Sequence, residues 1–271
     1  SGTKEEATDE LEDRIKKTVK SRMVSDVPLG AFLSGGIDSS TIVSLMQSQS
    51  DQPINTFTIG FHEKEFNEAV YAKKVAEHLD TNHTELYVTP QEAMDLIPKL
   101  PEMYDEPFAD SSQIPTHLIA TLAKENVTVA LSGDGGDELF GGYNRYLVAE
   151  KLWKVVGRIP NVLKKKAADL VNGISPESVE RFYRKIENIL PRKRNVSLPT
   201  EKFYKLARAF QATSTPQEIY RRIVSIIHEP KQLLTSGNEL STLLDAEAPW
   251  HEIDDTVLTM VYLDLMTYHP D

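Results

Sequence analysis

The sequence predicts an α/β fold in which a doubly wound parallel sheet over residues 1–146 precedes a mainly α-helical region over residues 147–271. In the first region, short runs rich in β-branched and aromatic residues alternate with segments whose apolar residues recur at helical spacing. This alternation is typical of parallel sheets. After Tyr146, apolar residues recur only at helical spacing, and prolines separate the segments. We therefore expect two domains, an α/β domain followed by a helical one.

The individual elements follow from local signals. An apolar stripe at four-residue spacing predicts a helix over residues 8–23, and Thr89-Pro90-Gln91-Glu92 has the form of a capping box that begins another helix. Asn67 is predicted to cap a further helix, with Phe66 and Tyr71 as its hydrophobic staple. Strands are predicted at 30–33, 54–61, 83–88 and 127–131, and the other helices at 37–47, 67–79, 114–124, 152–170, 179–190, 203–210 and 219–227.

The composition limits the classes of function. The 271 residues carry a formal net charge of −11, which argues against a general surface for nucleic acid or for an anionic membrane. The sequence contains no cysteine, which excludes disulfides, thiolate metal sites and a cysteine nucleophile within it, and agrees with a cytoplasmic location, which we expect. No apolar run approaches the length of a membrane span. From the start at Ser1-Gly2 and the abrupt end at Asp271, we expect an excised fragment.

The segment Leu33–Ser40 has the character of a phosphate-binding loop. It connects a predicted strand to a predicted helix, and such a turn presents free backbone amides and the positive end of the helix dipole to one point. Gly35 and Gly36 allow the main chain to approach an anion closely. Asp38 is suited to meeting phosphate oxygens through Mg²⁺, which prefers carboxylate and phosphate ligands. The segment also supplies three hydroxyl donors, Ser34, Ser39 and Ser40.

An ordinary turn, with Asp38 at the start of a helix, is the alternative interpretation of this segment. For an isolated Ser-Gly-Gly it would be the better one, but the strand before the segment and the helix after it favour phosphate binding. The segment matches neither the Gly-x-x-x-x-Gly-Lys-[Ser/Thr] pattern nor a Gly-x-Gly-x-x-Gly pattern that follows a strand.

A second segment, Leu131–Tyr143, combines five glycines with three acidic residues directly after a predicted strand. Asp134, Asp137 and Glu138 are candidates to hold a metal or to orient a substrate. The alternative is a plain acidic turn or a calcium loop, but the acids do not have EF-hand spacing. Since ligands of parallel sheets bind beyond the carboxyl ends of the strands, we expect both glycine-rich segments at the same edge of the sheet.

Several longer segments resemble one known family. The synthetase domain of the asparagine synthetase (glutamine-hydrolysing) family is similar to SDVPLGAFLSGGIDSS at 25–40, FTIGF at 57–61, DEPFADSSQIPT at 105–116 and LSGDGGDELFGGYNRY at 131–146, in that order. YLDLMTYHPD at 262–271 resembles a further segment of the same domain. The resemblance implies a fold of the PP-loop ATP pyrophosphatase type, with the second region forming the helical part of the synthetase domain, truncated at its C-terminus.

The resemblance also implies roles for individual residues. Asp38 and Asp137 would bind Mg²⁺ and, together with Asp134, would form the catalytic set. Asp134 stands where better-studied members have a glutamate that positions aspartate, so its shorter side chain would reduce efficiency or mark the subgroup that modifies sugars of surface polysaccharides. The pyrophosphate would be bound by Ser34, Gly35, Gly36, Asp38, Ser39 and Ser40, and the adenosine by Leu33, Ile59 and Gly133, with Ser132 beside the nucleotide.

The implied activity is ATP-dependent amide formation through an acyl-adenylate, from aspartate or a related carboxylate and ammonia, with release of AMP and pyrophosphate. The cofactors would be ATP and Mg²⁺; no nucleic acid or membrane partner is expected, and a homodimer is left open. The family's glutaminase domain, with its cysteine nucleophile, and a distal segment with a catalytic lysine both lie outside this sequence. The alternatives are another PP-loop adenylylating enzyme, or a nucleotide-binding module without activity.

Overall fold

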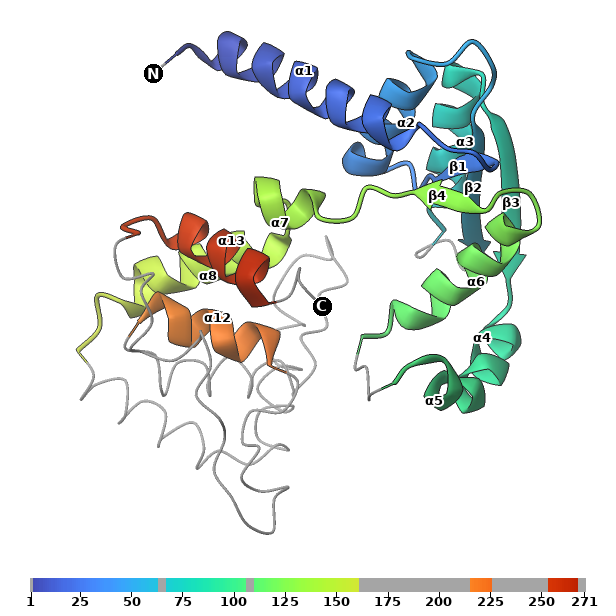
Figure 1. Cartoon of the computed structure of the whole chain (residues 1–271). Coiled ribbons are helices and arrows are strands. Elements are labelled where there is room, and N and C mark those ends of the chain that lie inside the picture. Colours follow the sequence, from blue (N-terminus) through green and yellow to red (C-terminus); the bar gives the residue numbers. More distant parts are fainter. Residues whose placement is uncertain (1, 63–66, 106–109, 161–214, 226–252, 268–271) are drawn as a thin grey trace, which may run out of the picture. The chain divides into compact units, whose positions relative to one another are not determined.

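The computed structural model describes residues 2–62, 67–105, 110–160, 215–225 and 253–267, which are drawn in colour in Figure 1. The chain divides into two compact units, Ser1–Asp134 and Gly135–Asp271. The division falls before the expected boundary at Tyr146, because the side chain of Tyr146 is fully buried in the core of the second unit.

The first unit contains a parallel sheet of four strands in the order β3-β2-β1-β4. All three pairs of neighbouring strands are parallel, and Ala31 of β1 lies beside Thr56 of β2 and Leu131 of β4. The parallel α/β sheet predicted from the alternating pattern is therefore confirmed. The strands are β1 (Leu29–Phe32), β2 (Asn55–Phe61), β3 (Asn82–Val88) and β4 (Val129–Leu131).

Helices cover both faces of this sheet. Ala31 and Leu33 belong to a buried cluster with residues of α1, α2 and α3, whereas Phe32 and Phe57 belong to a second cluster with residues of α6. Because successive residues of a strand point to opposite faces, this division gives the doubly wound arrangement that was predicted. The helices of the unit are α1 (Lys4–Arg22), α2 (Ile37–Gln47), α3 (Ala69–Leu79), α4 (Pro90–Leu96), the short 3₁₀ helix η1 (Ile97–Lys99), α5 (Leu100–Met103) and α6 (Gln113–Lys124).

Helix α1 begins at Lys4 rather than at residue 8, because Thr3 and Glu6 form a capping box. The Glu6 amide donates to Oγ1 of Thr3 over 3.2 Å, and the Thr3 amide donates to Oε2 of Glu6 over 2.8 Å. The capping box predicted at the start of α4 is confirmed, with the same two bonds between Thr89 and Glu92. These local hydrogen bonds satisfy amides that have no partner within the helix.

Helix α3 begins at Ala69 with Glu68 as its N-cap, so the prediction of Asn67 as the N-cap is wrong by one residue. Asn67 still serves the helix start, since its Oδ1 accepts a hydrogen bond of 3.2 Å from the Ala69 amide. Phe66, the expected staple partner of Tyr71, lies outside the described residues.

In the described part of the second unit, every regular element is a helix. α12 corresponds to the helix expected over 219–227. α8 overlaps the helix expected over 152–170 only at residues 152–156, and residues 161–170 of that prediction lie outside the described residues, as do the predicted segments 179–190 and 203–210. α13 was not expected. The core of this unit combines Tyr146, Ile219, Tyr220, Met260 and Leu263. The helices are α7 (Gly136–Phe140), α8 (Asn144–Val156), α12 (Pro216–Val224) and α13 (Thr256–Thr267).

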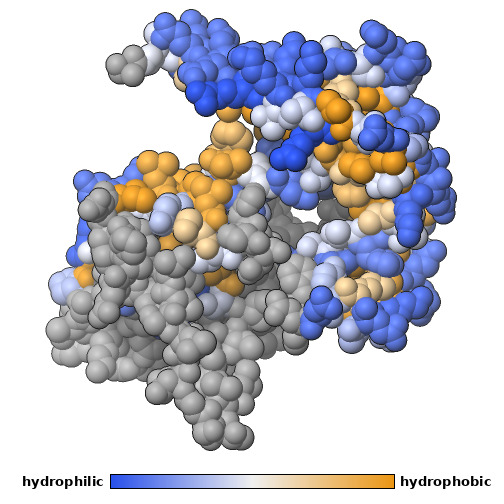
Figure 2. Space-filling model, viewed as in Figure 1, coloured by the Kyte–Doolittle hydropathy of each residue, from blue (hydrophilic) through white to orange (hydrophobic). Residues whose placement is uncertain are grey.

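The surface of α1 is strongly hydrophilic, as Figure 2 shows for the helix at the top of the view. Two exposed ion pairs span successive turns, Glu10 with Arg14 at 2.6 Å and Asp13 with Lys17 at 2.5 Å. Among the residues that the structure describes, no helix has both the length and the apolar character needed to cross a bilayer.

Candidate functional site

The two glycine-rich segments follow neighbouring strands of the sheet. One segment follows β1 and the other follows β4, and these strands are paired in parallel. Strands β2 and β3 lie on the other side of β1, so the order of the sheet reverses direction at β1. A crevice at such a switch point, beyond the carboxyl ends of the strands, is the usual ligand site of open parallel sheets. The topology therefore marks this edge as the candidate site.

The turn after β1 depends on Gly35, which has a φ of +80°. A Cβ at this position would come within 2.5 Å of the Ala72 amide nitrogen and 2.7 Å of the Tyr71 carbonyl carbon, both in α3. Only a residue without a side chain can adopt this conformation and lie so close to the backbone of α3. Gly35 thus fixes the turn against a neighbouring helix, a contact that the local sequence pattern does not reveal.

Helix α2 starts with Gly36 as its N-cap, and no side chain caps it. The first amides of an α-helix have no partner within the helix, and together with the helix dipole they attract anions. In α2 these first residues are Ile37, Asp38 and Ser39. The main chain is therefore suited to hold a phosphate group at this point.

Hydrogen bonds between two serines brace the loop from inside. Ser39 Oγ lies 2.9 Å from Ser34 Oγ and accepts a bond of 3.2 Å from the Ser34 amide, and the Gly36 amide donates to Ser34 Oγ over 3.2 Å. Ser39 is almost fully buried. In the structure, these two hydroxyls shape the loop, and their expected contact with pyrophosphate stays a prediction.

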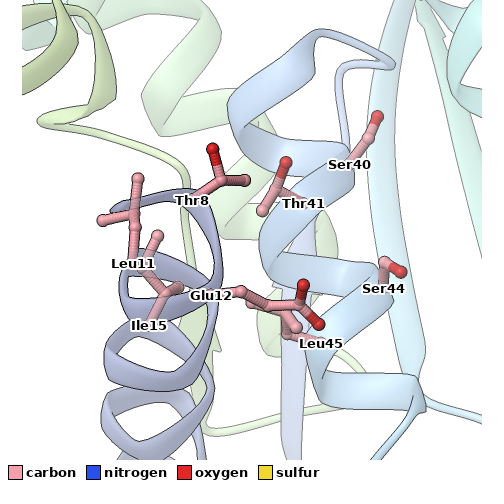
Figure 3. A pocket seen from close by; sticks show the side chains of 8 residues that line it. All are labelled: Thr8, Leu11, Glu12, Ile15, Ser40, Thr41, Ser44 and Leu45. Carbon is pink, nitrogen blue, oxygen red and sulfur yellow. The ribbon is translucent and has the colours of Figure 1, made fainter. Parts of the chain in front are cut away.

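Ser40 faces a different direction. It is among the residues that line a groove of about 470 Å³ between α1 and α2, and in Figure 3 its hydroxyl points away from Thr8 and Leu11 of α1. Its buried Oγ has no hydrogen-bond partner among the described residues. The expected role of Ser40 in binding pyrophosphate therefore also stays a prediction.

The second glycine-rich segment reaches the first one at Gly133. A Cβ on Gly133 would come within 2.7 Å of the Ser39 amide nitrogen and 3.0 Å of the Asp38 carbonyl carbon. Because the atoms in its way belong to the backbone, only glycine allows this approach. Ser132 and Asp134 flank Gly133, and the Ser132 hydroxyl lies 3.4 Å from the Asp134 amide. The structure therefore brings Ser132, Gly133 and Asp134 to the start of α2.

The two other residues assigned to the adenosine lie at the same edge of the sheet. Leu33 is buried, and its amide continues the β1–β2 pairing with a 2.9 Å hydrogen bond to the Phe57 carbonyl. Ile59 lies near the carboxyl end of β2, half-buried and in register with Leu86 of β3. Both positions agree with a site beyond the strand ends, although the amide of Leu33 is already used in the sheet.

Asp38 has the properties of a ligand for a phosphate-bound Mg²⁺. Its carboxylate is half-buried in the first turn of α2, and no residue of the described ranges forms a hydrogen bond or ion pair with it. Across the same ranges, no group of three or more His, Asp or Glu side chains is arranged to hold a metal ion. Mg²⁺ is commonly held by only one or two carboxylates together with substrate phosphates, so the single carboxylate fits this ion.

Asp137 belongs to the second unit, in the short helix α7. Its carboxylate lies over the α-carbon of Gly142, where any side chain would collide with it. Glu138, which we also considered for metal or substrate, is 5% exposed and accepts a 2.5 Å hydrogen bond from the Tyr143 hydroxyl. The carboxylate of Glu138 therefore bonds α7 to the residue Tyr143 that follows it, and its expected contact with a metal or substrate stays a prediction.

The sequence analysis also missed a buried carboxylate, Asp264 of α13. It is 1% exposed and accepts hydrogen bonds from Nη2 of Arg145 at 2.7 Å and from the hydroxyls of Tyr146 and Tyr220. Burial, followed by the hydrogen bond to Asp264, raises the pKa of both tyrosines, so both stay protonated donors. One signal in the sequence could have identified Asp264 as a buried carboxylate, because it is the single acid within the apolar run of residues 257–266.

Burial alone would lower the pKa of Arg145, but the hydrogen bond that it donates to Asp264 and the charge of that carboxylate outweigh burial and raise the pKa above its ordinary value. Arg145 therefore keeps its charge beside Asp264. A buried carboxylate that meets one cation and two hydroxyl donors is well compensated, and it joins α8, α12 and α13.

Comparisons with known proteins agree with the family resemblance of the motifs. A family model described as asparagine synthase matches residues 10–271. The chain is 44% identical over 170 residues to asparagine synthetase (glutamine-hydrolyzing) 1 of Bacillus subtilis, a match that covers 63% of this chain and 26% of that protein. It is 43% identical over 163 residues to putative asparagine synthetase (glutamine-hydrolyzing) 2 of Methanocaldococcus jannaschii, covering 58% and 31%. The chain thus spans less than a third of the length of these relatives.

Proposed function

This chain belongs to the asparagine synthase family, and we propose that it binds Mg·ATP beside the segment Leu33–Ser40 and uses it to convert a carboxylate into an amide. The observation that carries the proposal is the close approach of Gly133 to the backbone of Asp38 and Ser39. Two glycine-rich turns after neighbouring parallel strands meet there without a side chain between them. That arrangement leaves the main chain of both turns accessible to one ligand.

The proposed nucleotide position follows from these contacts. The first amides of α2 would hold the pyrophosphate, within the loop that Ser34 and Ser39 brace. The adenosine would lie over the strand ends near Leu33, Ile59, Ser132 and Gly133. We keep Ser40 among the residues proposed to bind pyrophosphate only because its motif resembles that of the family.

The proposed chemistry is adenylylation of the carboxylate. An oxygen of aspartate, or of a related carboxylate, attacks the α-phosphorus of ATP, pyrophosphate leaves, and ammonia then displaces AMP from the acyl-adenylate to give the amide. Asp38 and Asp137 would hold Mg²⁺, which when bound stabilises negative charge on the phosphates. The loop amides stabilise the same charge from the protein side. Asp134 would orient the carboxylate substrate beside Gly133.

The source of ammonia is a further part of the proposal. The two relatives are named as glutamine-hydrolyzing enzymes, whereas the 271 residues here contain no cysteine. We propose that a glutaminase domain supplies ammonia in the full-length protein and that this chain itself would use free ammonia. Ammonium salt therefore replaces glutamine in any assay of this chain.

The test is an analysis of products from ATP labelled at the α-phosphate. With Mg²⁺, aspartate and ammonium, AMP and pyrophosphate are expected in equal amounts, and AMP should depend on aspartate rather than on another acceptor. ADP as the product would contradict the scheme. AMP formation with other acceptors but not with aspartate would indicate a different PP-loop enzyme. Binding of ATP without formation of any product would indicate a nucleotide-binding module without activity.

Asp38→Asn is the matched variant for binding, because it keeps the size of the side chain and removes its charge. Loss of a charge-assisted contact is expected to weaken Mg·ATP binding by about tenfold or more in calorimetry. Asp51→Asn, in the exposed turn after α2, serves as the control with unchanged affinity. Equal affinities of both variants would remove the metal role from Asp38.

A further inference from the structure

A continuous series of contacts links the buried Asp264 of α13 to the acidic helix α7. Asp264 accepts a 2.7 Å hydrogen bond from Nη2 of Arg145. The guanidinium carbon of Arg145 lies 3.7 Å from the centroid of the Tyr143 ring. The hydroxyl of Tyr143 in turn donates to Oε1 of Glu138 in α7 over 2.5 Å. We call these four residues the Asp264–Glu138 chain.

Each link of this chain is stronger than an ordinary surface contact. Asp264 and Glu138 are 1% and 5% exposed, so water competes little for their oxygens. A guanidinium over a tyrosine ring at this distance is held by attraction to the face of the ring. The two ends of the chain are therefore coupled through side chains with fixed positions.

Helix α7 needs such external support. It has only five residues, and a helix of this length is not stable by itself in water. Its end at Gly141, with a φ of +69°, turns the chain back so that the amides of Gly141 and Gly142 bond to the Asp137 carbonyl. Glu138 connects α7 to Tyr143, a side chain that packs against the core of the second unit, through the 2.5 Å hydrogen bond.

We propose that Tyr143, Arg145 and Asp264 are positioning residues that hold α7 against the core of the second unit, so that the carboxylate of Asp137, next to Glu138, keeps one orientation within that unit when it serves as a metal ligand. This inference rests on the proposed function, since it takes Asp137 as a ligand of nucleotide-bound Mg²⁺. None of the three touches the metal or the nucleotide. They act through Glu138 and the backbone of α7.

The test compares Tyr143→Phe with Tyr220→Phe. The first variant removes the hydroxyl that reaches Glu138 and keeps the ring under Arg145. The second removes a hydroxyl of the same kind from the other oxygen of Asp264, away from α7. Both variants lose one hydrogen bond of the same network, so a general loss of stability affects both. Arg145→Lys is a third variant, which keeps the charge and loses the flat contact with Tyr143.

Two measurements distinguish a loss of positioning from a loss of stability. Each is made at a temperature below the unfolding transition of the variant. The first is binding of Mn²⁺, as a probe for Mg²⁺, with ATP, followed by electron paramagnetic resonance. Tyr143→Phe and Arg145→Lys should weaken it by up to about tenfold, the lower end of the loss seen when a direct partner of a metal ligand is removed, because they act on Asp137 through Glu138 and the backbone of α7. The second is hydrogen exchange of the α7 amides, which Tyr143→Phe should accelerate. Tyr220→Phe should change neither quantity.

The outcomes are distinguishable. If the wild-type chain binds Mn·ATP and Tyr143→Phe binds it equally well, the inference is overturned and the proposed function stands. If Tyr220→Phe weakens binding as much as Tyr143→Phe, the effect is one of general stability, and the inference is again overturned. If the wild-type chain binds no Mn·ATP, the proposed function falls, and the metal role of the Asp264–Glu138 chain falls with it.

Discussion

The α-carbon of Gly133 lies directly against the backbone of Ser39, so close that a Cβ on Gly133 would come within 2.7 Å of the Ser39 amide nitrogen. Gly133 follows β4, Ser39 belongs to the first turn of α2 after β1, and the two strands are paired. The contact joins two segments that are almost a hundred residues apart in the sequence. It is the physical basis of the proposed nucleotide site.

Gly133→Ala should separate the two turns. Since the methyl group meets backbone atoms of Asp38 and Ser39 that cannot rotate away, the segment after β4 has to shift. Displacement of groups that bind ATP is expected to lower Mg·ATP affinity about tenfold or more, measured by calorimetry. Val129→Ala, at a partly exposed position of the same strand, is the control with wild-type affinity. Unchanged affinity in Gly133→Ala would mean that the segment after β4 does not contact the nucleotide.

Gly35→Ala and Gly36→Ala should differ in stability although they are neighbours. An alanine at residue 35 has an unfavourable positive φ and overlaps the α3 backbone, which together are expected to cost about 2 kcal/mol or more. An alanine at residue 36, with a φ of −72°, meets only Oγ of Ser34, at 3.3 Å. Denaturant unfolding measures both free energies, and a loss as large for Gly36→Ala would refute this reasoning.

The sequence predicted the first unit well because its elements depend on local patterns. The alternation around Gly30 and Ile54 placed β1 and β2 to within one residue, and Thr89 with Glu92 marked the start of α4. The failures have non-local causes. Nothing near Gly35 in the sequence reveals that α3 lies against it, and nothing near Tyr146 reveals that its side chain is buried in the helical core.

The second glycine-rich segment was harder to predict, because one part of it is a turn and another part is a helix. Glycines predict a loop, but residues 136–140 form α7 once Glu138 bonds to Tyr143. Asp264 was overlooked because an acid among apolar residues contradicts the helical pattern that identifies a buried face. Its three donors come from residues more than forty positions away, which a single sequence does not show.

Asp264→Asn should destabilise the protein strongly. The substitution leaves Arg145 without its negative partner in a mostly buried position, and breaking such a pair is expected to cost about 3 kcal/mol or more. Glu150→Gln, which breaks an exposed pair with Lys154 one turn apart in α8, should cost about 0.5 kcal/mol at most. Equal effects of the two variants on the free energy of unfolding would show that the Asp264 network contributes little to stability.

His83 should make stability depend on pH. Burial lowers the pKa of His83; the charge of Glu85 opposes this, and that of Lys73 adds to it. Its Nδ1 lies 2.9 Å from Oγ1 of Thr56, whereas its buried Nε2 has no hydrogen-bond partner among the described residues. A second proton would therefore place a charge and a donor in an unfavourable position.

The direction of the effect follows from the lowered pKa. Between the folded value and the ordinary value of about 6.5, the unfolded chain binds more protons than the folded one, so stability rises with pH. The contribution is complete above the ordinary value and is lost as the pH falls below it. His83→Gln should flatten the dependence between about pH 5 and 7, and His78→Gln, at an exposed position of α3, should leave it as in the wild type. A wild-type slope in His83→Gln would contradict the assignment.

The most direct test of the proposed nucleotide site is a titration of the ¹⁵N-labelled chain with Mg·ATP, followed through the backbone amide resonances of Gly35, Gly36 and Gly133. If the segments after β1 and β4 form one site, all three resonances shift together and saturate with a single dissociation constant. Shifts confined to Gly35 and Gly36, with Gly133 unchanged up to saturation, would contradict the shared site. No shift in any of them would contradict nucleotide binding at this edge of the sheet.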